Sequence, residues 1–245
     1  MYDKIERLGK SIIQHGKYND RIYLMKLHRD DSPHIFPKLK KLAAAKQYSK
    51  IFAKVPAWAL ETVRERGYEK EAMVPRFYEG KTDAFFCSKY LKEARKKLKA
   101  PAKELIQENI KLSQSKKGKG VAKAPPPSYS IRKIEREDAG QLAEVYEKVF
   151  PSYPFPIFET DYLLKTMDDH VIYFGVFKNN RLVAASSAEM DRQSRNAEMT
   201  DFATLPEFRR KSLAVLLLKE MEREMAAMKF PTVYTIARSH SPGMN

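Results

Sequence analysis

The chain has 245 residues, of which 43% are hydrophobic and 11% aromatic, enough for two domains that each have a core. No run approaches the roughly 18 consecutive apolar residues of a membrane span, and the N-terminal residues lack the apolar region of a signal peptide. We therefore expect a cytoplasmic protein with no membrane partner. The single cysteine, Cys87, excludes an intramolecular disulfide, and the five histidines lack metal-ligand spacing, so we expect no metal.

The net charge of +15 is unevenly distributed. Residues 1–100 hold 24 Lys and Arg against 12 Asp and Glu, whereas residues 131–245 hold 16 against 17. A basic half could attract nucleic acid, but surface lysines also keep proteins soluble and shield strand edges. Aromatic residues in this half follow apolar strand patterns, as core residues do, so we expect no nucleic-acid partner.

Residues 1–98 predict a small α/β domain in the order β-α-β-α-β-β. Pro37 suits the first turn of its first helix, Gly67 ends the second, and Gly80 marks a turn between the last two strands. The predicted elements are a strand over 21–27, a helix over 36–48, a strand over 50–56, a helix over 57–68, and strands over 69–80 and 83–91.

Residues 99–128 predict a linker that is first helical and then rich in Pro and Lys. The helical pattern runs over 92–112 with a break at Pro101. In the stretch 114–128, Lys, Gly and three consecutive prolines replace any apolar periodicity, which excludes both a helix and a central strand.

Residues 129–245 predict a second α/β domain, in which a mixed sheet is flanked by helices. Two apolar strands flank the Asn179-Asn180 pair, which indicates a hairpin. The predicted elements are a strand over 130–135, helices over 138–149 and 157–168, strands over 170–177, 181–190 and 196–205, a helix over 212–228 and a strand over 232–237.

The most informative stretch runs from the strand that ends near Leu205, through a turn with Pro206, into the helix that begins near Ser212. Backbone N–H groups in the first turn of a helix lack partners within the helix and carry partial positive charge. The run Arg209-Arg210-Lys211 adds cations that are unfavourable for the helix alone, so an anion is expected to offset them. A basic surface turn is the simpler alternative.

The run PEFRRKSLA resembles the pyrophosphate-binding signature of the GNAT acetyltransferases: Arg or Gln, two residues, Gly, one residue, then Gly or Ala. Arg209 fills its first position and Ala214 its last, while Ser212 stands where the family usually has glycine. Because serine brings a Cβ close to the phosphates, either its hydroxyl donates to them or cofactor affinity falls. The resemblance implies an α/β, GNAT-like fold and acetyl-CoA as cosubstrate.

Further stretches are similar to the beta-lysine N-acetyltransferases of methanogenic archaea and bacteria, which make the compatible solute N-epsilon-acetyl-beta-lysine. They include KLKKLAAAKQYSKIFAKVPAWA, GYEKEAMVPRFYEG, DAFFCSKYL and IARSHSPGMN. This likeness implies a small-molecule amine as substrate. The first domain resembles the latter part of a GNAT domain without its phosphate signature, and it is expected to be degenerate and non-catalytic.

The resemblance also assigns candidate site residues. Glu198, on the strand beside the expected thioester, is the first candidate for the base that deprotonates the amine, and Asp201 is the second. Strict alternation along the strand would place these two side chains on opposite faces. Glu159 and Asp161 are candidates for the substrate's other ammonium group, with helix capping as the alternative. The expected cofactor-binding residues are Phe202, Ala203, Thr204, Arg209, Arg210, Lys211, Ser212, Leu213 and Ala214.

In the family, the strand at 232–237 is followed by a helix and two strands, often with a tyrosine that protonates the thiolate. This sequence ends at Asn245, so we expect the last strands to be missing, the acid to be unassigned and the open strand edge to favour self-association. Two rival functions remain: a GNAT enzyme with another amine acceptor, such as a protein lysine or a polyamine, and an inactive basic nucleic-acid or scaffold protein.

Overall fold

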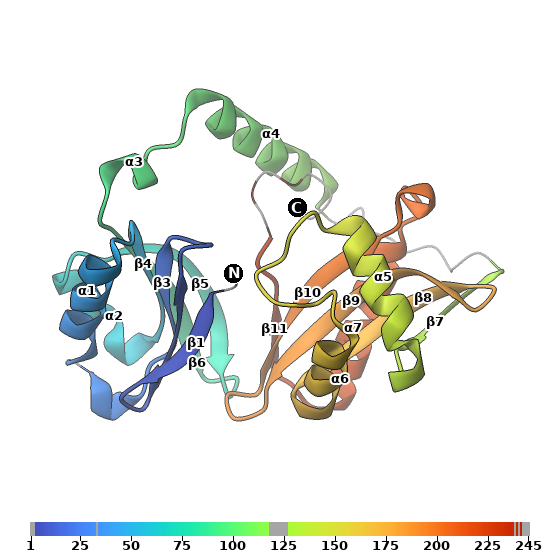
Figure 1. The fold of residues 1–245 in the computed structure, drawn as a ribbon, viewed down its shortest axis with the longest axis horizontal. Helices are drawn as coiled ribbons and strands as arrows, with labels where there is room; N and C mark the ends of the chain where they lie inside the picture. The colour runs from blue at the N-terminus through green and yellow to red at the C-terminus, as the bar shows by residue number, and fades with distance from the viewer. Residues whose placement is uncertain (1–2, 33, 118–126, 238, 240, 242–245) are drawn as a thin grey trace. The chain divides into compact units, whose positions relative to one another are not determined.

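The computed structural model describes residues 3–32, 34–117, 127–237, 239 and 241 (Figure 1). The chain forms two compact units, Met1–Lys99 and Ala100–Asn245. Most of the predicted Pro/Lys-rich stretch, residues 118–126, lies outside the described residues. No helix among the described residues is long and apolar enough to cross a membrane.

The first unit is built on one six-stranded sheet in the order β1-β2-β3-β4-β6-β5. Only β3 and β4 pair in parallel, and the other neighbours are antiparallel. The strands are β1 (Lys4–Leu8), β2 (Ser11–Gly16), β3 (Arg21–Lys26), β4 (Lys50–Pro56), β5 (Glu69–Tyr78) and β6 (Thr82–Tyr90), and the helices are α1 (Ile35–Lys46), α2 (Leu60–Glu65) and α3 (Glu93–Lys96).

The core of this unit lies between one face of the sheet and helices α1 and α2 (Figure 1). Alternate residues of β3 and β4, including Ile22, Leu24 and Ile51, are wholly buried there. Cys87 is also wholly buried, and burial raises the pKa of its thiol. His15 is a buried core histidine whose ring nitrogens contact the Tyr48 hydroxyl at 3.0 Å and a Glu6 carboxylate oxygen at 2.8 Å.

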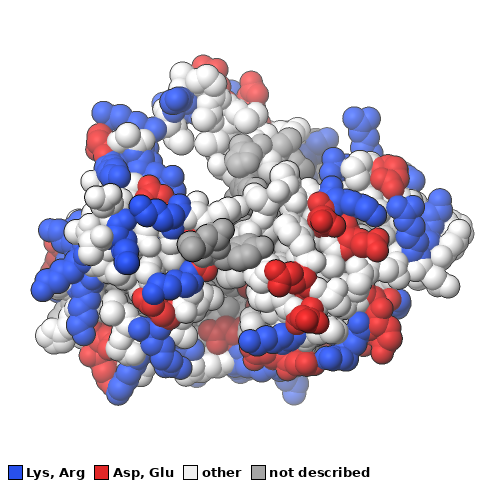
Figure 2. All heavy atoms as spheres, viewed as in Figure 1, with Lys and Arg blue, Asp and Glu red and all other residues white. Residues whose placement is uncertain are grey.

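From residue 21 onward the predicted order β-α-β-α-β-β is confirmed, but the sheet also contains β1 and β2, which were not predicted. The helical stretch after β6 is interrupted at residues 97–99, and Pro101 lies in the first turn of the following helix, where a missing N–H is tolerated. The break therefore lies a few residues before the predicted one. Lys and Arg side chains cover much of the visible face of the first unit, with acidic side chains among them (Figure 2).

The second unit contains a five-stranded sheet in the order β11-β10-β9-β8-β7. The predicted hairpin is confirmed, with Asn179 and Asn180 both at positive φ in its turn. The strands are β7 (Tyr129–Lys133), β8 (Val171–Lys178), β9 (Arg181–Asp191), β10 (Asn196–Thr204) and β11 (Thr232–Tyr234), and the helices are α4 (Ala100–Lys116), α5 (Ala139–Val149), α6 (Thr160–Asp169) and α7 (Leu213–Ala227).

Helices cover the two faces of this sheet. On one face, the Tyr173 hydroxyl of β8 lies 2.9 Å from Thr166 of α6, and its ring packs near Tyr146 of α5. On the other face, the Ser186 hydroxyl of β9 donates to the Met221 sulfur of α7 at 2.9 Å. Figure 1 shows α5 and α6 in front of the sheet. The site described below lies on the α5/α6 face and at the start of α7.

Candidate active site

Strands β10 and β11 run in parallel for only three residues and then part. The last register pair is Glu198 with Tyr234, after which β11 ends. β10 continues to Thr204 and stays paired with β9 on its other side. The edge of β10 that follows Glu198 is thus not paired with any strand of the described residues, so its backbone groups can receive an extended ligand.

A row of polar side chains crosses the sheet where the two strands part. Glu198 of β10 is in register with Glu189 of β9 on one side and with Tyr234 of β11 on the other. Residues in register point to the same face, so all three lie on the α5/α6 face. The Tyr234 hydroxyl donates to Glu198 Oε2 at 3.2 Å, which orients this half-buried carboxylate. Neither Glu189 nor Tyr234 was singled out from the sequence.

Asp201 lies on the same face as Glu198, contrary to the alternation predicted from the sequence. A bulge between Thr200 and Ala203 interrupts the pairing of β10 with β9, and Asp201 adopts a positive φ of 55° within it. Its carboxylate accepts hydrogen bonds from the Ser187 hydroxyl at 2.7 Å and from the Tyr153 hydroxyl. The Asp201 residue is only 6% exposed, whereas Glu198 is half-buried and therefore more accessible.

The burial of Asp201 gives a prediction about pH and stability. Burial raises the pKa of this carboxyl above its ordinary value, against the lowering effect of its hydrogen bonds to Tyr153, Ser187 and Thr200. The folded protein thus holds the proton more tightly than the unfolded chain does. The resulting stabilisation is fully present below the unfolded pKa and is lost as pH rises through the folded pKa.

Wild type should therefore lose stability relative to Asp201→Asn as pH rises from about 4 towards neutral, by about 1.4 kcal/mol for each pKa unit of elevation. Urea unfolding of both proteins across this range measures the difference. Glu147→Gln, which removes an exposed carboxylate from α5, is the control and should show no such trend. A constant difference between wild type and Asp201→Asn would contradict the prediction.

Free backbone N–H groups line the start of α7. Ser212 caps the helix in the left-handed conformation (φ 57°), and Arg210, two residues earlier, is also left-handed (φ 64°). Among the described residues, nothing accepts hydrogen bonds from the backbone N–H groups of residues 210–214. Consecutive N–H groups in such alternating conformations form a concave anion site, and the helix dipole adds to it. The geometry fits a diphosphate.

The three cations before Ser212 are placed differently. Arg209 Nε donates to the Thr204 carbonyl oxygen at 3.2 Å, which ties this side chain to the end of β10. Lys211 Nζ contacts the Tyr129 hydroxyl at 3.2 Å and lies 5.3 Å from the centre of the Phe208 ring. No described residue pairs with the exposed Arg210 guanidinium. Arg210 is thus the cation most open to a phosphate ligand.

The left-handed conformation of Ser212 explains why glycine is usual at this position. A residue with a Cβ is strained there by about 1–2 kcal/mol, and this exceeds the entropy that glycine loses on folding. Ser212→Gly should therefore stabilise the protein by about 0.5–1 kcal/mol and bind acetyl-CoA at least as tightly. Thermal unfolding and calorimetric titration check both effects.

Ala is the informative comparison at this position, since Ser212→Ala keeps the Cβ and removes only the hydroxyl. If Ser212→Gly and Ser212→Ala both weaken acetyl-CoA binding, the serine hydroxyl itself contributes to the phosphate site.

The remaining residues that were predicted to bind the cofactor lie on β10 and α7. Phe202, Ala203 and Thr204 form the last part of β10, with Ala203 and Thr204 in register with Ala185 and Ala184 of β9. Leu213 and Ala214 begin α7, where the Leu213 side chain is buried in the core.

Both predicted substrate-binding carboxylates lie at the start of α6. Glu159 is the residue before α6, and Asp161 lies in its first turn. Both are exposed, and Glu159 makes no side-chain cap. Acidic residues are favourable near a helix N-terminus whether or not a ligand binds.

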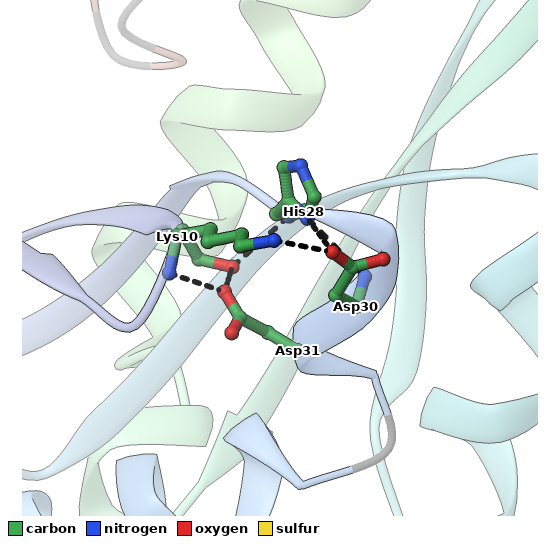
Figure 3. Close-up of polar contacts among 5 residues, drawn as sticks. Lys10, His28, Asp30 and Asp31 are labelled. Carbon is green, nitrogen blue, oxygen red and sulfur yellow. Dashed lines mark hydrogen bonds and ion pairs between the residues drawn. The ribbon is translucent and has the colours of Figure 1, made fainter.

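A hollow in the first unit shows no sign of being a binding site. It is lined by Leu8, Asp30, Asp31, His34, Ile35 and Lys38. Its carboxylates are already used, because Lys10 Nζ bonds Asp30 at 2.6 Å and Asp31 accepts from the Lys10 backbone and the Ser11 hydroxyl (Figure 3). No group of His, Cys, Asp and Glu in the described part of the chain could hold a metal ion.

Comparisons with known proteins show which family the chain resembles. The acetyltransferase (GNAT) family matches residues 132–242. The chain is 38% identical over 245 residues to a beta-lysine N(6)-acetyltransferase of Methanococcus maripaludis, covering 99% of this chain and 87% of that protein. It is 30% identical to a beta-lysine N(6)-acetyltransferase of Methanosarcina mazei (84% of this chain, 83% of that protein) and 29% identical to the N-acetyltransferase YodP of Bacillus subtilis (96% and 84%). The chain therefore belongs to the GNAT family of acetyl-CoA-dependent N-acetyltransferases.

Proposed function

We propose that this protein transfers the acetyl group of acetyl-CoA to the distal amine, N6, of beta-lysine. The observation that carries the proposal is the identity of 38% over 99% of the chain with a protein named for this reaction. The likeness extends through the first unit, beyond the residues that match the GNAT family, so it concerns more than the shared acetyl-CoA chemistry.

Each part of the site has a role in this proposal. Acetyl-CoA supplies the acetyl thioester, and the N–H groups of residues 210–214 with the Arg210 guanidinium would hold its diphosphate. The unpaired edge of β10 would bind the pantetheine arm through backbone groups. Glu198 would take the proton of the attacking amine, directly or through water, with Tyr234 holding its carboxylate in place.

The amine needs a base because an alkyl ammonium has a pKa of about 10.4 and is almost fully protonated near neutral pH. Glu198 lies where β10 and β11 part, so its carboxylate would be next to a thioester bound along β10. Because the amine then attacks the acetyl carbonyl directly, no covalent intermediate on the protein is required.

Turnover of acetyl-CoA with different amines tests the proposal. The purified chain is given beta-lysine, lysine, spermidine or a lysine-containing peptide, and released thiol is measured. We expect turnover with beta-lysine to exceed the others by at least about 10-fold in kcat/KM, since a site built around polar groups discriminates strongly against substrates that leave those groups unpaired. NMR of the product should place the acetyl group on N6. Preference for spermidine or the peptide would instead favour an enzyme with another acceptor.

We also infer that the reaction takes place in the cytoplasm, where acetyl-CoA is made and used, and that the chain self-associates. Support for association comes from the outer edge of β11, which is not paired with any strand of the described residues. Sedimentation measured over a range of protein concentrations tests this, and a constant monomer mass would contradict it.

A further inference from the structure

The buried carboxylate of Asp201 joins three segments of the second unit. Its oxygens accept hydrogen bonds from the hydroxyls of Ser187 on β9 at 2.7 Å and of Thr200 on β10 at 3.4 Å, and from that of Tyr153 between α5 and α6. The Asp201 residue is 6% exposed, and it forms no ion pair with the described residues. Because a buried carboxylate without a counterion depends on its hydrogen bonds, loss of one hydroxyl changes how this carboxylate is held.

Of the three donors, Tyr153 alone comes from outside the sheet. Ser187 and Thr200 are register partners on β9 and β10, so strand pairing already holds them together. Tyr153 belongs to residues 150–159, which form neither a helix nor a strand, and Ile157 of the same segment is buried in the core. Apolar burial is not directional, whereas a hydrogen bond restricts both distance and angle. The Tyr153 bond therefore gives this segment a fixed point on β10.

This fixed point lies at the bulge of β10. Asp201 adopts its positive φ within the bulge, three residues after Glu198 and directly before residues 202–204, which belong to the edge proposed to bind acetyl-CoA. Segment 150–159 runs in front of β10 on the α5/α6 face (Figure 1). Since the Tyr153 bond holds the segment against the same strand, an acceptor amine beside Glu198 would also lie close to the segment.

The Tyr153 hydroxyl remains a hydrogen-bond donor near neutral pH. Burial and the neighbouring charge of Asp201 raise its pKa well above the ordinary value. The ring also packs against Phe150, with the two ring centres 5.2 Å apart. Changing Tyr153 to phenylalanine therefore removes the hydrogen bond to Asp201 and keeps the apolar packing of the ring.

We propose that Tyr153 is a positioning residue for the acetyl acceptor: its bond to Asp201 holds segment 150–159 in the arrangement to which the amine binds. The inference rests on the proposed function for the identity of the amine and for Glu198 as the base. When the bond is lost, the segment has to be ordered as the amine binds, and this cost weakens amine binding. Acetyl-CoA binding should change little, because its proposed diphosphate site lies at the start of α7.

Steady-state kinetics of Tyr153→Phe tests the proposal. We expect the KM for beta-lysine to rise about 10- to 100-fold, as for loss of a hydrogen bond to a charged group, while kcat and acetyl-CoA affinity stay within about threefold of wild type. Tyr173→Phe is the matched control, because it removes a buried hydroxyl on the same face whose partner, at 2.9 Å, is Thr166 of α6. This control should keep the wild-type KM.

Hydrogen exchange gives a readout that needs no turnover. The backbone amides of residues 150–159 should exchange faster in Tyr153→Phe than in wild type, and those of β8 should exchange equally in both proteins. A variant that is merely less stable would instead show a lower kcat at unchanged KM and faster exchange throughout the second unit.

That result, or a KM and an exchange rate equal to those of wild type, would overturn the assignment of Tyr153. The proposed function fails in a different way. A wild type that acetylates spermidine and not beta-lysine would overturn the proposed function alone, and the KM comparison between wild type, Tyr153→Phe and Tyr173→Phe would then use spermidine.

Discussion

Glu198→Gln should lower kcat for amine acetylation by about 10²- to 10⁴-fold and leave acetyl-CoA affinity nearly unchanged. The carboxamide keeps the size of the side chain and can still accept the hydrogen bond from Tyr234, but it cannot take a proton. Steady-state rates at saturating acetyl-CoA measure kcat, and calorimetric titration measures affinity.

The pH dependence makes the test of Glu198 more specific. Without a base, the variant depends on amine that is already neutral in solution, a fraction that grows about tenfold per pH unit below a pKa of about 10.4. The rate gap between wild type and Glu198→Gln should therefore narrow as pH rises. Glu222→Gln, an exposed carboxylate on α7, is the matched control and should behave as wild type. A kcat within about threefold of wild type would exclude Glu198 as the base, since general bases contribute far more.

The sequence predicted most elements of both units, and the misses can be traced to particular residues. Strand β2 places Gln14 and His15 at buried positions, so its hydropathy does not alternate as that of a half-buried strand should. The burial of His15 depends on a partner far along the chain, the Tyr48 hydroxyl. Strand β11 ends at Tyr234, three residues earlier than predicted, although residues 235–237 continue the apolar pattern.

The two halves of the site differed in how far they could be predicted. The start of α7 is a local feature, in which a strand, a turn, a basic run and an apolar helix follow one another within about 20 residues, a spacing that fits one phosphate-binding motif. The acceptor side depends on strand register. The register of β9 places Glu189 opposite Glu198, and the bulge that turns Asp201 to the same face arises from pairing between β9 and β10.

Removing two of the cations before α7 should give the largest loss of cofactor binding. In Arg209→Ala with Arg210→Ala, we expect acetyl-CoA affinity to fall about 10²- to 10⁴-fold, since each charge-assisted hydrogen bond to phosphate contributes about 1.5–3 kcal/mol. Part of the loss would come from the Arg209 bond to the Thr204 carbonyl oxygen, which ties the turn to β10. Calorimetric titration with acetyl-CoA measures the affinity of each protein.

Single variants and salt separate these contributions. Arg210→Ala alone should weaken binding and reduce its salt dependence, because this guanidinium has no partner among the described residues and is free to meet phosphate. Arg223→Ala, which removes an exposed arginine of α7 paired with Glu220, is the matched control and should bind as wild type does. The proposed diphosphate site needs both the cations and the free N–H groups at the start of α7. Unchanged acetyl-CoA affinity in the double variant would therefore show that acetyl-CoA binds elsewhere.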